Sequence, residues 1–373
     1  MDIKNGMEHR TSLRIAKSIL EIVGVILKRV MIRKVVIAIK FMFRGMARIK
    51  IVPFILLLWS CSAKEYSYIS ETDFSETIRM EKKGGFDVLA RIDAMTVVGN
   101  NLLVRADQNT NIFSLYDFAG ELQKSWGEKG RAPGEYMIPM ISKVDFNSFM
   151  VYDIPIERKE YYLINGDSLF MQEAIKLNNM QDMPLSIHSM DKNTIVYDRR
   201  QPKELSIYKY HDDGTITHIT SMEDYKENYS DSKVYMGYLE INPMEDCFVY
   251  AFQYIDGFDI YDMQGNDICK VRRESFKTPS NSDYSLQKTY CFAIDKSENG
   301  FLLYRVNYSG HELMNNLSCV TYIEEYDWSG NPIRRYELPL FASNIAYIGN
   351  GEFIVYDAYS EDESIKHFAP SYQ

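Results

Sequence analysis

The sequence predicts an all-β fold, a six-bladed β-propeller with four-stranded blades, from two observations. The first is a four-residue motif of two apolar residues followed, in five of its six copies, by tyrosine; the copies are 103–106, 150–153, 195–198, 248–251, 302–305 and 354–357. The second is their spacing, because the third positions of successive copies are 47, 45, 53, 54 and 52 residues apart. A repeat of about 40–55 residues is typical of a propeller blade, a small sheet that must stack on its neighbours around an axis.

Turn residues divide each repeat into four strands. In the first repeat we expect strands at 88–98, 102–106, 111–117 and 121–126. A glycine follows the third strand in five repeats, and glycine accepts the positive φ that tight turns need. Its distance from the motif is 14 to 17 residues in four repeats and 26 in the fifth, which predicts an insertion at 309–316. These glycines are Gly120, Gly166, Gly214, Gly265 and Gly330.

The sixth repeat lacks residues for an outer strand. Its third strand is expected at 364–368, and the sequence ends at Gln373. An open sheet edge invites pairing with other chains, and ring propellers avoid one by borrowing a strand from the other terminus. We therefore expect residues 74–80 to complete the last blade and close the ring.

The first sixty residues differ in charge and hydropathy from the rest. Residues 46–61 begin with a basic stretch, continue with the apolar run 51–59 and end in Leu58-Trp59-Ser60-Cys61. That ending resembles the lipobox of bacterial lipoproteins, and the apolar run is too short to span a bilayer. The resemblance implies a signal peptide at 46–61, lipidation of Cys61 and a lipid-anchored protein of the cell envelope. Ser62 in the second position implies the outer membrane. The alternative is an uncleaved anchor that ends in a cysteine by chance.

The remaining boundaries follow from this interpretation. Residues 1–45 contain a basic amphipathic stretch, and we interpret them as a wrongly assigned start or as a helical or disordered extension. Residues 62–73 are expected to be a linker, and residues 74–373 the propeller.

Charge and cysteine content exclude some functions. Residues 1–60 contain 12 Lys and Arg against 3 Asp and Glu, which leaves 30 against 49 in residues 61–373. This acidic body argues against a nucleic-acid partner, since phosphate binding needs a basic face. There is no C-x-x-C pair, and we expect buried free thiols at Cys247, Cys269, Cys291 and Cys319.

One segment carries a family resemblance. The sequence at 126–136, Trp-Gly-Glu-Lys-Gly-Arg-Ala-Pro-Gly-Glu-Tyr, resembles the crossover signature of NHL-type propellers, where glycines and a proline turn the chain between blades. Together with the lipobox and the six repeats, residues 66–373 resemble the TolB-like six-bladed propeller lipoproteins. The resemblance implies a fold and carries over no catalytic residue.

Candidate site residues come from the repeat. Common hydrolase, metalloprotease and nucleotide-binding motifs are absent from the sequence. Residues just after the expected second strands occupy equivalent places in every blade, so their charges are expected around one face, where they could bind a sugar, a peptide or a Ca²⁺ ion. The alternative is that these charges pair across blades and close strand ends. The residues are Arg105, Asp107, Asp153, Asp198, Arg199, Arg305 and Asp357.

Two further features bear on recognition. The repeated tyrosines Tyr152, Tyr197, Tyr250, Tyr304 and Tyr356 are expected to pack between blades rather than to form a carbohydrate platform. The connections 222–245 and 274–288 are long and polar, and loops of this kind often carry function.

These observations favour a lipid-anchored, non-enzymatic binding or scaffolding module with a protein or glycan ligand and no cofactor. The alternative is a propeller hydrolase or lyase of the lactonase type, with a divalent metal ion such as Ca²⁺ in the central channel. A sensor that acts on a membrane partner is the third hypothesis.

Overall fold

The computed structural model describes residues 66–371, apart from 89–90, 167, 179, 181–183, 202–203, 223–231, 275–286, 316–318 and 361–362. These residues belong to one unit, Tyr66–Gln373. The predicted extension, the signal peptide and Cys61 lie outside the described residues, as do parts of the polar connections at 222–245 and 274–288.

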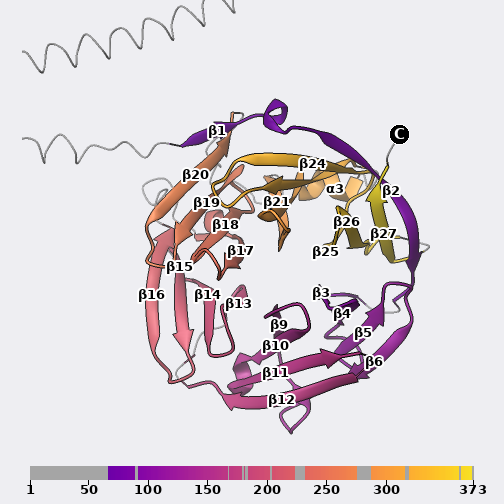
Figure 1. Ribbon diagram of the computed structural model, residues 1–373, viewed down its shortest axis with the longest axis vertical. Coiled ribbons are helices and arrows are strands. Elements are labelled where there is room, and N and C mark those ends of the chain that lie inside the picture. Colours follow the sequence, from indigo (N-terminus) through magenta and orange to yellow (C-terminus); the bar gives the residue numbers. More distant parts are fainter. Residues whose placement is uncertain are drawn as a thin grey trace, which may run out of the picture. The chain divides into compact units, whose positions relative to one another are not determined.

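Four sheets follow one another along the chain, each with its strands in sequence order from the inside of the ring to the outside (Figure 1). The first has β3 (Ala94–Val98), β4 (Asn101–Arg105), β5 (Phe113–Asp117) and β6 (Leu122–Trp126). The second has β9 (Pro139–Lys143), β10 (Ser148–Asp153), β11 (Arg158–Asn165) and β12 (Ser168–Lys176). The third has β13 (Ile187–Ser189), β14 (Thr194–Arg200), β15 (Leu205–His211) and β16 (Ile216–Met222). The fourth has β17 (Gly237–Asn242), β18 (Cys247–Phe252), β19 (Gly257–Asp262) and β20 (Asp267–Arg273), with β1 (Ser67–Ile69) added in parallel outside β20.

A fifth, eight-stranded sheet occupies the rest of the ring. Its order is β21-β22-β23-β24-β2-β27-β26-β25. The strands are β21 (Lys288–Lys296), β22 (Phe301–Ser309), β23 (Thr321–Tyr326), β24 (Pro332–Leu338), β2 (Thr77–Phe86), β27 (Ile365–Pro370), β26 (Glu352–Tyr356) and β25 (Asn344–Gly349). The innermost strands contact one another in an unbroken cycle, β3–β9–β13–β17–β21–β25 and back to β3. The predicted all-β ring of sheets is therefore confirmed.

The sequence motif lies on the second strand of each sheet, where it is buried on both faces. All six residues of β10 and of β18 are buried, whereas the outer strand β12 is mostly exposed. A strand that is covered on both faces by neighbouring sheets has a continuous run of apolar residues, rather than an alternation of apolar and polar residues. The tyrosines pack between sheets as expected: Tyr152 and Tyr304 are fully buried, and their hydroxyls bond Ser189 Oγ at 2.8 Å and the Ala342 N–H at 2.7 Å.

The N-terminal strand joins the two halves of the eight-stranded sheet. Residues Thr77–Arg79 of β2 pair in parallel with β24, and Met80–Phe86 pair antiparallel with β27, the last strand of the chain. The expected donor strand, 74–80, was therefore placed about six residues too early. The reason is that residues 81–86, Glu-Lys-Lys-Gly-Gly-Phe, do not alternate between apolar and polar side chains. They pair with β27 through backbone hydrogen bonds, which the side-chain sequence does not reveal. The expected linker at 62–73 also contains structure, namely β1 and the 3₁₀ turn Glu71–Asp73.

Smaller elements agree with the turn predictions. The five glycines that follow third strands have positive φ, between 58° and 89°. In the 126–136 segment, β7 (Glu128–Lys129) and β8 (Glu135–Tyr136) form a short parallel ladder, and Gly127 and Gly134 have φ of 81° and 82°. The predicted insertion forms the helix α3 (Gly310–Asn315). Two more 3₁₀ turns occur at Ile154–Ile156 and Ser232–Tyr235. The first strand is shorter than expected, since β3 begins at Ala94 rather than at residue 88.

The four cysteines of the described unit are free thiols. Cys247, Cys291 and Cys319 are buried and Cys269 is half-buried. Burial raises the pKa of Cys247 to about 12 and that of Cys269 to about 11, so both remain protonated at neutral pH.

Candidate functional site

The seven charged residues predicted after the motif serve mainly to close strand ends. Arg105 forms an ion pair with Asp107 at 3.1 Å and donates from Nη1 to the carbonyl of Pro139 in the next sheet. Asp153 accepts the backbone N–H groups of Met137 and Ile138, at 2.6 and 3.3 Å. These contacts match the alternative in which the charges close strand ends or pair across blades.

The remaining members are engaged in the same way. Asp198 is fully buried and accepts the Ser186 N–H at 2.5 Å. Arg305 bonds Asp256 at 2.9 Å.

Asp357 bonds Lys366 at 2.6 Å, and Arg199 lies half-buried on β14. None of the seven lines the central cavity described below. Asp357 lines a separate cavity of about 970 Å³ near Asp93 and Tyr359. The structure therefore does not bring the seven together.

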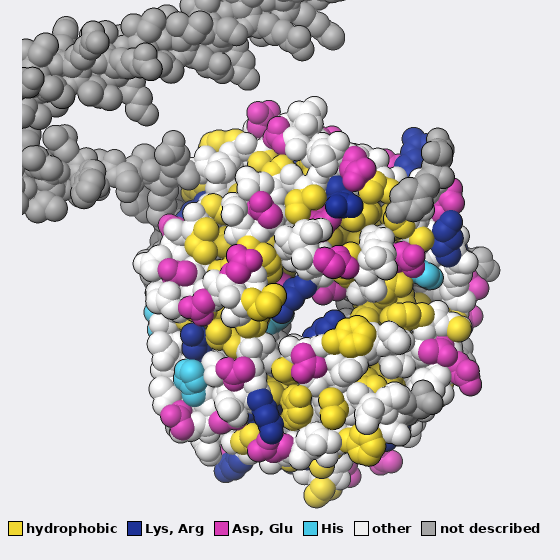
Figure 2. Space-filling model, in the orientation of Figure 1, with side chains coloured by type: hydrophobic (Ala, Val, Ile, Leu, Met, Phe, Trp, Pro, Cys, Tyr) yellow, Lys and Arg dark blue, Asp and Glu magenta, His cyan; other side chains and the backbone are white. Residues whose placement is uncertain are grey.

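A different set of residues surrounds the axis of the ring. Figure 2 shows an opening at the centre of the molecule with basic side chains at its rim. The cavity there has a volume of about 570 Å³ and is lined from all six innermost strands and the turns that follow them. Its charged and aromatic members are Lys143, Asp145, Phe146, His188, Glu240, Asp295, Lys296, Glu298 and Tyr347.

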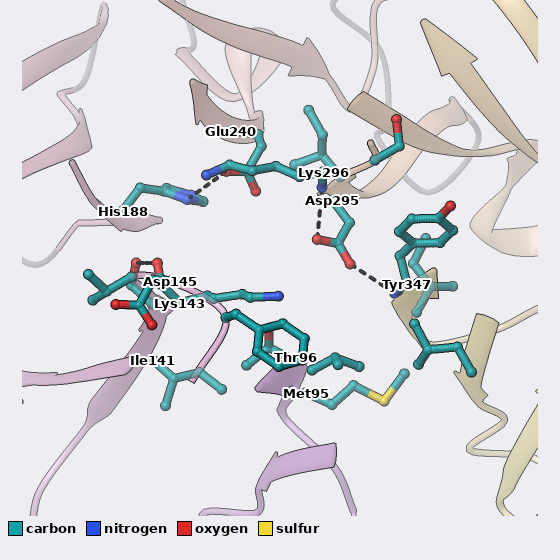
Figure 3. A pocket seen from close by; sticks show the side chains of 18 of the residues that line it. Met95, Thr96, Ile141, Lys143, Asp145, His188, Glu240, Asp295, Lys296 and Tyr347 are labelled. Carbon is teal, nitrogen blue, oxygen red and sulfur yellow. Dashed lines mark hydrogen bonds and ion pairs between the residues drawn. The ribbon is translucent and has the colours of Figure 1, made fainter. Parts of the chain in front are cut away.

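Glu240 lies between two basic side chains. Its Oε1 is 3.6 Å from His188 Nδ1 and 3.5 Å from Lys296 Nζ (Figure 3). Burial acts to raise the pKa of Glu240, but Lys296 and His188 outweigh it and lower the pKa to about 2. Glu240 is therefore ionised at neutral pH and is a poor proton donor or acceptor for catalysis.

Asp295 lies on the neighbouring wall with both carboxylate oxygens engaged. Oδ1 accepts the Lys296 N–H at 2.8 Å, and Oδ2 accepts the Tyr347 N–H at 2.9 Å (Figure 3). Desolvation is the main cause that raises the pKa of Asp295 to about 6, and the negative charge of Glu240 adds to it.

Two more carboxylates at the rim are also engaged. Asp145 Oδ1 accepts the Asn147 N–H at 2.9 Å and so closes the turn between β9 and β10. Glu298 accepts the Tyr347 hydroxyl at 2.5 Å. Every carboxylate of the cavity wall therefore already accepts at least one hydrogen bond.

Lys143 is the exception among the charged residues of the wall. It ends β9, is exposed, and points its ammonium group into the cavity (Figure 3). Within the part of the chain that the structure describes, no ion pair or hydrogen bond engages its Nζ. The cavity thus presents one unpaired cation among carboxylates that are already satisfied.

The repeat contains a signal for these residues that the motif-based prediction did not include. Counting nine residues back from the third position of the motif gives Thr96, Lys143, His188, Asp295 and Tyr347, all of which line the cavity; in the fourth repeat the lining residue, Glu240, is ten back. This offset marks the inner strand of each hairpin. The prediction instead followed the second strand to its far end, which does not reach the central cavity.

Among the described residues, no group of three or more His, Cys, Asp or Glu side chains is placed to hold a metal ion. The donor set that a divalent ion needs is therefore not found in the described part of the channel. The helices among the described residues are too short or too polar to cross a bilayer.

Comparisons with known proteins concern the fold. No family model matches the sequence, and a search of curated proteins finds no match. Among solved structures, a member of the DUF4221 family from Bacteroides vulgatus ATCC 8482 has a TM-score of 0.53 and 12% identity, over 79% of this chain and 98% of that chain. A candidate exported protein from Bacteroides fragilis NCTC 9343 has a TM-score of 0.49 and 14% identity, over 83% of this chain and 99% of that chain. The calcium-binding protein regucalcin from Agrobacterium tumefaciens C58 has a TM-score of 0.45 and 10% identity, over 79% and 95%. At these identities the likeness to the DUF4221 protein shows a shared fold and nothing about ligands.

Proposed function

We propose that this chain is a non-enzymatic binding module of the cell envelope, and that its ligand carries an anionic group bound by Lys143 in the central cavity. The observation that carries the proposal is the unpaired ammonium group of Lys143, directed into a cavity of about 570 Å³. Ligand sites are concave, and a few precisely placed polar groups orient the ligand within them.

The arrangement of charges favours a ligand with both an acid group and hydroxyl groups. The wall carboxylates are held in place by backbone and side-chain donors, so their remaining lone pairs can accept hydrogen bonds from hydroxyls. An anionic group placed among them is stabilised only next to Lys143, which defines its position. A protein ligand and a glycan ligand can both supply such a group.

The observed contacts give no support to the hydrolase or lyase alternative. Glu240 is held ionised between two basic groups, and Asp295 has both oxygens bonded to backbone N–H groups. A general base needs a pKa near the working pH and access to the proton it removes. Glu240 fails the first condition, because its pKa is lowered to about 2. The pKa of Asp295 is raised to about 6, but each of its oxygens is already bonded to a backbone N–H, so we assign both carboxylates a role in positioning the wall of the cavity.

We propose further that the ring has six blades in the manner of the TolB-like and NHL-type propellers. In this interpretation the eight-stranded sheet consists of two blades. One blade is β21–β24, and the other is β25–β27 with the second half of β2 as its outer strand. The first half of β2 pairs with β24 and so joins the two blades at their outer edges. The unbroken cycle of six innermost strands supports this count.

We also propose that Cys61 anchors the ring to the outer membrane through lipid. The support is the sequence at 58–61 and its place five residues before Tyr66, where the propeller unit Tyr66–Gln373 begins. Replacing Cys61 with serine should move the protein from the membrane fraction to the soluble fraction. Mass spectrometry that finds an unmodified amino terminus upstream of Cys61 in the native protein would contradict the anchor.

The binding proposal is tested by calorimetric titration of the full chain in detergent with uronic acids, acidic peptides, sulfate and phosphate. We expect saturable binding of at least one of these anions. Lys143→Met should weaken that binding by about tenfold or more, because a hydrogen bond to a charged group contributes about 1.5–3 kcal/mol.

The matched control is Lys176→Met. Lys176 is an exposed lysine on the outer strand β12, where it pairs with Glu157 at 3.3 Å, and it lines no described cavity. Its replacement should leave binding unchanged. Binding that survives in Lys143→Met, or the failure of every anion to bind, would refute the proposal.

A further inference from the structure

A second, smaller cavity continues outward from the central one. It has a volume of about 280 Å³ and lies between the sheet β3–β6 and the sheet β9–β12. The two cavities share Gly99 and Phe146, so a ligand that fills the central cavity can extend over Phe146 into this cleft.

Phe146 separates the two cavities and is presented to solvent. The residue is 62% exposed. The backbone around it is fixed on both sides: its carbonyl accepts the Gly99 N–H at 2.5 Å, and the carbonyl of Asn147 accepts the Ile164 N–H at 2.8 Å. A Cβ at Gly99 would lie 3.0 Å from Asn147 Oδ1, so only glycine lets the two turns approach this closely without displacing that side chain. The backbone of the turn that presents Phe146 is therefore held in place.

The polar residues that line the cleft are four amides and the carboxylate of Asp117. Asn100, Asn101, Gln123 and Asn147 line it, and Gln123 Nε2 donates to Asp117 at 3.3 Å, which leaves Gln123 Oε1 to accept. No hydrogen bond among the described residues engages the side-chain amides of the three asparagines. An amide offers both donors and an acceptor, which match the hydroxyls of a sugar, since each hydroxyl both donates and accepts.

These features together indicate a sugar rather than a peptide. The apolar face of a sugar ring packs on an exposed aromatic ring, while its hydroxyls bond to surrounding amides. A peptide would instead need apolar pockets for its side chains or an open strand edge for its backbone. Apart from Phe146, the only large apolar residue that lines the cleft is Ile164, which is buried.

We infer that the ligand is an acidic oligosaccharide, with its acid sugar in the central cavity at Lys143 and the next sugar stacked on Phe146 in the amide cleft. This inference rests on the proposed function and specifies its ligand class. The acid group is a carboxylate or a sulfate, since Lys143 binds either as a point charge.

The test uses the full chain in detergent on an array of oligosaccharides of two to six sugars. The array holds uronate-containing chains, sulfated chains, neutral chains of the same length, single acid sugars and acidic peptides. We expect at least one acidic oligosaccharide to bind ten times more tightly than its single acid sugar, and the neutral chains not to bind. Whether uronate or sulfate chains are retained identifies the acid group.

Variants then locate the second sugar. Asn101→Ala, which changes only the cleft, should reduce the tenfold gain and leave the affinity for the single acid sugar unchanged. Phe146→Ala should remove the gain, and because Phe146 also lines the central cavity, its effect is read from the ratio of the two affinities. The control Phe170→Ala removes another exposed aromatic side chain, 47% exposed on the outer strand β12, and should have no effect.

The outcomes separate this inference from the proposed function. Equal affinity for oligosaccharide and single sugar, or full binding by Phe146→Ala, overturns the extended site and leaves Lys143-dependent binding standing. Binding of acidic peptides alone, lost in Lys143→Met, overturns the sugar ligand but supports the proposed function. Absence of any Lys143-dependent binding overturns both.

Discussion

Asp198, at the end of the buried strand β14, illustrates the role of the charged residues after the motif. Its Oδ1 accepts the Ser186 N–H, while its Oδ2 is buried without a hydrogen-bond partner among the described residues. Burial raises the pKa of Asp198 to about 6. An acid whose pKa is raised by folding is protonated more readily in the folded state than in the unfolded state. Its ionisation therefore opposes folding as the pH rises from about 4 to about 6.

Asp198→Asn should remove this penalty, because asparagine keeps the Oδ1 acceptor and carries no charge. Two pKa units correspond to about 3 kcal/mol, so at pH 8 the variant should be more stable than the wild type by up to that amount. The difference should shrink as the pH falls from 6 to 4 and vanish below 4, where the wild-type carboxyl is protonated in both states. Urea unfolding at a series of pH values measures it. A difference that does not change with pH would show that burial of the charge is not its cause.

At the scale of the hairpin, the turn after the third strand meets the neighbouring sheet closely in some repeats and not in others. Gly265 has φ of 86°, and a Cβ there would lie 2.2 Å from the backbone oxygen of Ile219 on β16 of the preceding sheet. Gly166 has φ of 58° in the equivalent turn, and a Cβ there would have no heavy atom within 4 Å. The two positions therefore separate the cost of the backbone conformation from the cost of contact between sheets.

Gly166→Ala should lower the free energy of unfolding by about 1 kcal/mol, the usual cost of an alanine at positive φ. Gly265→Ala should lower it by more than about 3 kcal/mol, because a contact with rigid backbone adds to the same conformational cost. Midpoints of chemical unfolding compare the two variants with the wild type. Equal losses would mean that the turn of Gly265 does not touch the neighbouring sheet.

The strands and turns could be predicted where the pattern of side chains in the sequence reflects them. The motif on the second strands and the glycines after the third strands are both direct consequences of burial and of positive φ, and both were found from the sequence. The pairing of residues 81–86 with β27 was misplaced because backbone hydrogen bonds, not side chains, form it.

The candidate site was missed for a related reason. Lys143, His188 and Asp295 differ in residue type from repeat to repeat, and only their common offset from the motif places them on one wall. Lys143 could be singled out as a binding residue only after the partners of the other charged residues of the wall were known. That pairing depends on distances across the ring, which no spacing along the chain supplies.

At the scale of the whole unit, the N-terminal segment holds consecutive sheets together from outside. β1 pairs with β20, and β2 pairs first with β24 and then with β27 (Figure 1). Phe74, between the two strands, is buried against Tyr326 at 5.5 Å between ring centroids and lies under the guanidinium of Arg273 at 5.3 Å. Through hydrogen bonds and packing the segment joins the beginning of the unit Tyr66–Gln373 to its last strand, and the ring it closes surrounds the cavity that contains Lys143.

Amine-specific acetylation of the full chain, read by mass spectrometry with and without the acidic oligosaccharide that it binds most tightly, tests the central claim most directly. The account predicts that Lys143 reacts readily in the free protein and that the saturating oligosaccharide slows its reaction at least tenfold, while Lys176 on the outer strand reacts at the same rate in both. Lys143 that reacts equally fast with the oligosaccharide bound would contradict the account, since its ammonium group would then not hold the ligand.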